Sequence, residues 1–151
     1  MKLKEYDFRD GDIRKKILDL LRGKVFHVTK YSAYQSILKS DAIETNVDGR
    51  FGYTYSMSST GRKADCVCFF DLRNKTQKVI DRSINGLDFM DSRIFGEKIV
   101  YLFLVSDFHE ELISPRKIQA TFPGRYIPDV EMLHEGFVPL RKIEKSIVVY
   151  V

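Results

Sequence analysis

The chain has 151 residues, 44% of them hydrophobic and 30% charged, which suits one globular domain over residues 1–151. No apolar run approaches the roughly 20 residues that span a bilayer, and the first residues lack the apolar stretch of a signal peptide. We therefore expect no membrane association and a cytoplasmic location. The formal net charge of +4 permits a nucleic-acid or nucleotide partner without requiring one.

Hydrophobic periodicity and turn residues predict the elements along the chain. In chain order these are a helix over 12–22, a strand over 25–29, a helix over 32–40 with a capping-box pattern at Ser32 and Gln35, a long loop over 44–63, a strand over 66–70, a mainly irregular stretch over 73–97, strands over 99–105, 117–121 and 126–133, a short helix over 139–145, and a strand over 147–151.

The order and strength of these elements predict the fold class. The run over 99–105 is continuously apolar, so we expect it at the centre of a sheet. Helices and strands do not alternate regularly, which indicates an α+β fold. No glycine-rich phosphate fingerprint is present, and this argues against Rossmann and P-loop proteins.

Two polar side chains stand inside apolar runs that are far apart in the sequence. His27 lies between Phe26 and Val28, and it is either a core histidine with one hydrogen bond or a donor to a ligand hydroxyl or phosphate. Glu131 also has apolar flanks, and a buried glutamate must be paired, protonated or functional. Asp129 shares a face with Glu131 if the strand is regular.

The remaining candidates are weaker. Cys66 and Cys68 point to one face of a strand, and we expect buried free thiols. His134 and Glu135 are expected at the surface, in a turn that ends at Gly136. The three histidines match no metal motif, so we expect no metal site.

An aromatic and hydroxyl-rich segment over residues 51–60 includes Tyr53, Tyr55 and Ser58. Such a loop can stack on planar rings and bind sugars, or it can be a polar hairpin with exposed tyrosines. Arg50, Arg62 and Lys63 flank it, as phosphate ligands or as ordinary surface charges.

Two parts of the chain resemble the ADP-ribosyltransferase-fold proteins. One is the His27-x-Thr29 strand with its following helix. The other is Asp129-x-Glu131, followed by residues 136–140 and a final strand. The likeness covers roughly residues 25–40 and 126–151, and it is closest to the nucleic-acid-modifying and toxin-like branches. Asp129 stands where the family often has glutamine or glutamate. The resemblance implies a split, mixed or antiparallel sheet with a few short helices.

The resemblance also implies an activity, in which NAD is the substrate and ADP-ribose passes to an acceptor. Glu131 would hold a ribose hydroxyl and stabilise positive charge, and Asp129 would face the acceptor. His27, Thr29, Tyr53, Tyr55 and Ser58 would contact NAD. Residues 119–125 would select the acceptor, with Phe122 and Arg125 exposed.

The acceptor, nucleic acid or protein, stays open at this point. A toxin or phage-defence effector, with an antitoxin as a candidate partner, is the role that the resemblance implies. Two alternatives remain. One is a non-catalytic nucleotide- or nucleic-acid-binding module of the same fold. The other is a nucleic-acid-binding or nuclease domain that uses Arg50, Arg62, Lys63 and the tyrosines, and whose binding would weaken with salt.

Overall fold

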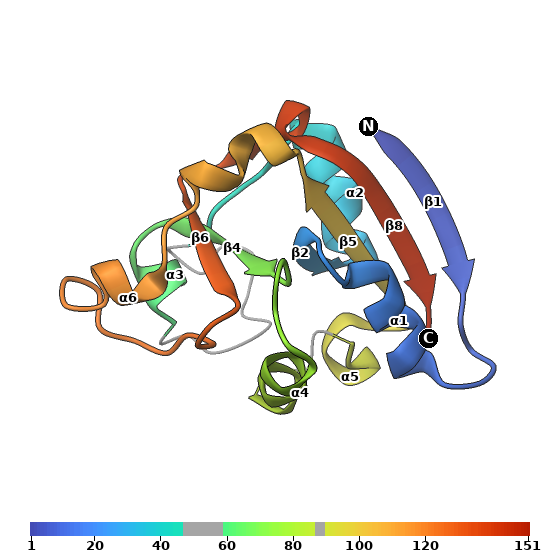
Figure 1. Ribbon diagram of the computed structural model, residues 1–151. Coiled ribbons are helices and arrows are strands. Elements are labelled where there is room, and N and C mark those ends of the chain that lie inside the picture. Colours follow the sequence, from blue (N-terminus) through green and yellow to red (C-terminus); the bar gives the residue numbers. More distant parts are fainter. Residues whose placement is uncertain (47–58, 87–89) are drawn as a thin grey trace.

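A mixed six-stranded sheet runs through the molecule, with helices on both of its faces (Figure 1). The computed structural model describes residues 1–46, 59–86 and 90–151. The sheet strands are β1 (Lys2–Asp7), β2 (Val25–Lys30), β4 (Cys66–Asp71), β5 (Lys98–Leu104), β6 (Glu131–Glu135) and β8 (Ile143–Tyr150). They follow the order β1-β8-β5-β2-β4-β6, and β3 (Ala42–Ile43) pairs separately with β7 (Val138–Pro139).

Strand β5 is a central strand of the sheet. It pairs antiparallel with β8 along its whole length and with β2 from Ile99 to Phe103. Its residues from Ile99 to Leu104 are all buried, which explains why they read as one continuous apolar run. The prediction of a central strand here is confirmed. Among the strands of the described sheet, the outer strand β1 alone pairs in parallel, along β8, and the other pairs are antiparallel.

Helices cover the two faces of the sheet with separate hydrophobic clusters. Helices α1 (Ile13–Leu21), α4 (Gln77–Gly86) and α5 (Ser92–Phe95) pack on the face that carries Phe26 and Tyr101. Helix α2 (Tyr31–Ser40) packs on the opposite face with Phe69 and Leu102 (Figure 1). An α+β fold with a mixed sheet and several short helices is therefore confirmed.

The two N-terminal helices form where periodicity predicts them. The side chain of Asp12 caps α1 by accepting a hydrogen bond from the Lys15 amide at 3.2 Å. Helix α2 begins at Tyr31 with Lys30 as its N-cap, and no side-chain bond caps it. The capping-box prediction at Ser32 is therefore wrong, because Ser32 already lies inside the helix.

The remaining short elements lie mainly in the second half of the chain. They are α3 (Thr60–Lys63), α6 (Pro115–Ile118), and the 3-10 helices η1 (Ser106–Glu111) and η2 (Leu140–Lys142). The strand expected over 117–121 is wrong, because Pro115 begins a helical turn there. In the described parts of the chain, no helix is long and apolar enough to cross a membrane.

The strand expected over 126–133 begins only at Glu131 and runs on to Glu135. Residues 128–130 form a turn, and Asp129 within it has a φ of 70°. Aspartate is among the few residues that adopt this left-handed backbone readily. The expectation that Asp129 and Glu131 share one face of a regular strand is therefore wrong.

The sheet opens between β2 and β4. These strands pair at only two positions, Val25 with Asp71 and Phe26 with Phe70. Beyond Phe26, β2 continues along β5, whereas β4 pairs with β6 from Cys66 to Phe70. The sheet therefore parts next to His27.

Candidate functional site

His27 lies at this opening and connects the two strands through its side chain. Its Nδ1 lies 2.8 Å from the backbone carbonyl oxygen of Cys68, and its ring lies 5.9 Å from the Phe69 ring. Because a carbonyl oxygen only accepts, Nδ1 carries the proton in this bond. Burial lowers the pKa of His27, although the bond to Cys68 opposes this effect. The imidazole is therefore neutral near pH 7, and its Nε2 is an acceptor.

Glu131 is held by the turn that precedes β6. Its backbone N–H donates to the Ile127 carbonyl at 3.2 Å, and its Oε1 accepts from the Ile127 N–H at 3.3 Å. The side chain is partly buried. Burial raises the pKa of Glu131 to about 7, and the hydrogen bond from the Ile127 amide opposes part of this rise. Its carboxyl group is thus divided between the acid and the carboxylate near neutral pH.

Cys68 connects the two candidate side chains. Its backbone carbonyl accepts from His27, and its thiol donates to the Phe69 carbonyl at 3.8 Å. Burial, together with the nearby charge of Glu131, raises the pKa of the thiol well above its usual range. In the β4–β6 register Glu131 lies opposite Phe70, so Glu131 and Cys68 are diagonal neighbours on one face. The same register assigns His27 to the other face of the sheet, beside Phe69. The structure therefore places His27 and Glu131 on opposite faces of the sheet, each next to Cys68, and not in contact with one another.

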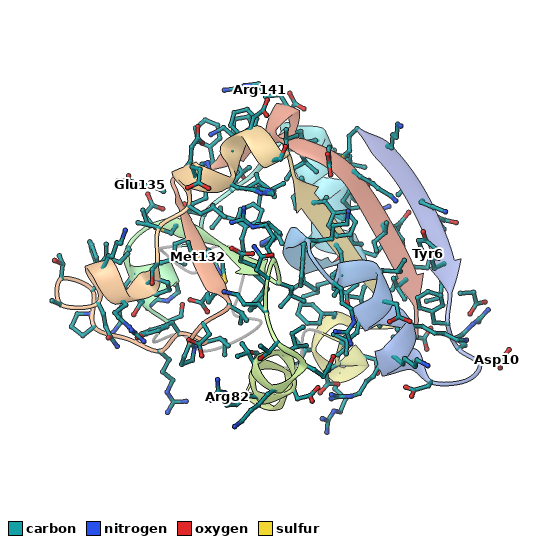
Figure 2. All side chains as sticks on the ribbon, viewed as in Figure 1. Tyr6, Asp10, Arg82, Met132, Glu135 and Arg141 are labelled. Atoms are coloured by element: carbon teal, nitrogen blue, oxygen red, sulfur yellow. The ribbon has the colours of Figure 1, made fainter. Side chains whose placement is uncertain are left out.

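Asp129 lies outside this group. It is exposed in the turn before β6, and its Oδ2 lies 3.5 Å from the guanidinium of Arg82 on α4. Figure 2 labels Arg82 on α4, and Met132 and Glu135 on β6. The ion pair is solvent-exposed and therefore weak. A role for Asp129 toward an acceptor stays a prediction.

The structure describes only some of the other predicted site residues. Thr29 is buried on β2, opposite Val100 of β5. Tyr53, Tyr55, Ser58 and Arg50 lie outside the described residues. In the predicted acceptor loop Arg125 is exposed but Phe122 is partly buried, which corrects the expectation for Phe122.

The surface position predicted for His134 is wrong, because this side chain is only 6% exposed. Its Nδ1 lies 3.2 Å from the Gly136 carbonyl, and its Nε2 lies 3.1 Å from the Lys142 ammonium. Lys142 also donates to Glu111 at 2.7 Å. Leu133 and His134 are consecutive on β6 and both are buried, so the strand is covered on both faces at this position and simple alternation does not predict the burial of His134. This cluster fastens β6 to η1 and η2.

Open space in the described structure does not mark the same place. A surface pocket of about 530 Å³ lies beyond the end of β2, where Lys30 and Tyr31 face Lys98, and neither His27 nor Glu131 lines it. Among the described residues, no group of three or more His, Cys, Asp or Glu side chains forms a candidate metal site. The candidate site is therefore identified by the hydrogen bonds and pKa shifts of His27 and Glu131 and not by a pocket.

No family model, no curated protein and no solved structure matches this chain. The arrangement of His27, Cys68 and Glu131 at the opening of the sheet therefore carries the functional argument. It offers a neutral hydrogen-bond acceptor and a carboxyl group that changes charge near neutral pH.

Proposed function

We propose that this chain is an ADP-ribosyltransferase-like enzyme that binds NAD at the opening between β2 and β4. The observation that carries the proposal is the placement of His27 and Glu131 around Cys68 where the sheet parts. The His27-x-Thr29 strand near the start of the chain and the carboxylate strand near its end support it, because that order resembles the ADP-ribosyltransferase fold.

In this reaction the bond between the ribose C1′ and the nicotinamide nitrogen breaks, and its electron pair leaves with nicotinamide. Positive charge then develops on the ribose ring, as in glycoside hydrolysis. A Glu131 carboxylate stabilises that charge and holds a ribose hydroxyl. The acceptor nucleophile or water completes the reaction by bonding to C1′ and losing its proton.

The hydrogen bond of His27 limits which ligand groups this residue can bind. Since Nδ1 donates to Cys68, the free nitrogen of the neutral ring accepts a hydrogen bond. A ribose hydroxyl can donate such a bond, whereas an ionised phosphate cannot. Of the two ligand groups considered from the sequence, the hydroxyl is therefore favoured.

A non-catalytic nucleotide-binding module of the same fold is the second candidate. Two observations favour it: Oε1 of Glu131 already accepts from Ile127, and the described pocket lies elsewhere. Calorimetric titration with NAD separates a binding protein from a chain without an NAD site. Turnover then separates the enzyme from the module.

Replacement of Glu131 by glutamine tests the enzymatic proposal. We expect Glu131→Gln to lower NAD cleavage by about 100-fold or more, because the neutral amide stabilises the developing charge poorly. The measurement is nicotinamide release from labelled NAD in the presence of separate protein, DNA and RNA pools. Label in one pool identifies the acceptor class.

Glu135→Gln is the matched control, because Glu135 lies on the same strand and face but is exposed. Its turnover should equal that of the wild type. Circular dichroism and thermal melting confirm that both variants fold. Full turnover by a folded Glu131→Gln variant would contradict the proposal.

A further inference from the structure

We propose that the pocket beyond the end of β2 is a second binding site, which takes a phosphate group of a small soluble ligand. The pocket has a volume of about 530 Å³, within the range of small-molecule sites. It lies between the junction of β2 with α2 and the segment that leads from α5 into β5. Neither His27 nor Glu131 lines it, so this site is independent of the proposed function.

Antiparallel pairing brings two lysines to this end of the sheet. Lys30, the last residue of β2, pairs with Ile99 of β5, and Lys98 comes directly before Ile99. Both lysines line the pocket. Among the described residues, neither of them is part of an ion pair. Two ammonium groups at one opening create a positive potential that attracts an anion.

Two aromatic rings hold the Lys98 ammonium in place. Its Nζ lies 4.7 Å from the centroid of the Tyr31 ring and 5.2 Å from the centroid of the Tyr150 ring. Such cation–π contacts fix the position of the charge and, unlike an ion pair, add no carboxylate that would compete with a ligand. The Lys98 side chain therefore loses little further freedom when it binds an anion, and this favours affinity.

Arg93 and Glu97 are the other charged residues among those described around the pocket. Arg93 is exposed and is paired with Asp91, its Nη2 lying 2.7 Å from Oδ2. Glu97 is exposed as well. Because the charges of Arg93 and Glu97 offset each other, the two lysines leave the lining with a positive excess.

The remaining polar side chain that the argument needs is Ser32, which lines the pocket and is exposed. Its hydroxyl can donate a hydrogen bond to an anion. A phosphate group carries up to two negative charges and three or more acceptor oxygens. It therefore satisfies two ammonium groups and a hydroxyl together more completely than a carboxylate does.

NMR titration of the ¹⁵N-labelled protein, in the absence of NAD, tests the site. The probes are inorganic pyrophosphate, adenosine 5′-diphosphate and adenosine. Both phosphate-bearing probes should shift the amide signals of residues that line the pocket, such as Ser32 and Lys98, whereas adenosine should not. Tighter binding of adenosine 5′-diphosphate than of pyrophosphate would identify a nucleotide as the source of the phosphate, and the reverse order would identify an inorganic ion.

Replacement of Lys98 tests the role of the held charge. Lys98→Gln should weaken pyrophosphate binding by about tenfold or more, because it removes a charge-assisted contact. Lys98→Arg should retain binding, since a guanidinium also binds phosphate and stacks on aromatic rings. Lys4→Gln is the matched control, because the Lys4 ammonium lies 5.1 Å from the Tyr6 ring but does not line the pocket.

Circular dichroism confirms that the three variants fold. Absence of pocket shifts with both phosphate-bearing probes would overturn the site, as would equal shifts with adenosine. Equal losses of affinity in Lys98→Gln and Lys4→Gln would overturn it too, because they would show a general effect of net charge. Shifts confined to the surroundings of His27 and Glu131 would place the phosphate at the other site and would also contradict this one.

Discussion

At the scale of single residues, Glu131 makes stability depend on pH. Its pKa is about 7 in the folded chain, above its ordinary value of 4.5, so the folded state binds more protons between these pH values. The stability associated with the protonated carboxyl is fully present below pH 4.5 and is lost as pH rises through about 7. Burying the charged form is what costs free energy at the higher pH.

Glu131→Gln should therefore stabilise the protein at pH 8 relative to pH 4. We expect the difference in unfolding free energy between variant and wild type to change by about 3 kcal/mol over that range. Urea denaturation at several pH values measures it. Glu135→Gln, at an exposed position, should show little change, and a pH-independent difference for Glu131→Gln would contradict the buried carboxyl.

The sequence singles out Glu131 correctly as unusual, because apolar residues flank it on both sides. It does not reveal that Cys68 is a diagonal neighbour of Glu131, which depends on the register between β4 and β6. The left-handed backbone at Asp129 is equally hidden, since aspartate is common in strands, turns and caps alike. Register and turn geometry are tertiary outcomes that a local pattern leaves undetermined.

At the scale of elements, α3 packs directly against β6. A Cβ added at Gly61 would stand 2.8 Å from Cδ2 of Leu133, a residue with no exposed surface. Gly61 therefore lets the short helix approach the strand that begins with Glu131.

A double-mutant cycle tests the contact. Gly61→Ala should destabilise the protein by about 1–3 kcal/mol through overpacking, and Leu133→Ala by about 2–5 kcal/mol through a cavity. In the double variant the alanine methyl group enters space that Leu133 vacates. The combined cost measured by urea denaturation should therefore be at least 1 kcal/mol, roughly, below the sum. Simple additivity would show that the two residues do not share this space.

Elements with strong periodicity are predicted well, whereas short ones are not. Helix α1 and strand β5 are long enough for their apolar pattern to dominate. Helix α6 has four residues, and its tertiary contacts decide its conformation. Helix α4 has ten residues, one more than α1, but it lies in a polar stretch whose pattern predicts mainly irregular structure, so length alone does not decide which helices are predicted.

At the scale of the whole molecule, the opening between β2 and β4 divides the sheet into parts that differ in how extensively their strands pair. Strand β5 is paired on both sides, whereas β2 and β4 share only two paired positions. Residues of β4 still enter both hydrophobic clusters, so the parts remain joined through packing. The sheet therefore combines a rigid ladder with a junction of few backbone hydrogen bonds.

Hydrogen exchange should reveal this division. Amides of β5 should exchange most slowly, and those of β4 and β6 should open at a lower free energy, because local opening there breaks fewer ladder bonds to the rest of the sheet. Exchange followed by mass spectrometry over β2, β4, β5 and β6 peptides measures both. If NAD binds at the junction as proposed, it should slow exchange in β2, β4 and β6 more than in β1. Equal protection of β4 and β5 in the absence of NAD would show that the opening has no effect on local stability. The result with NAD does not change this conclusion.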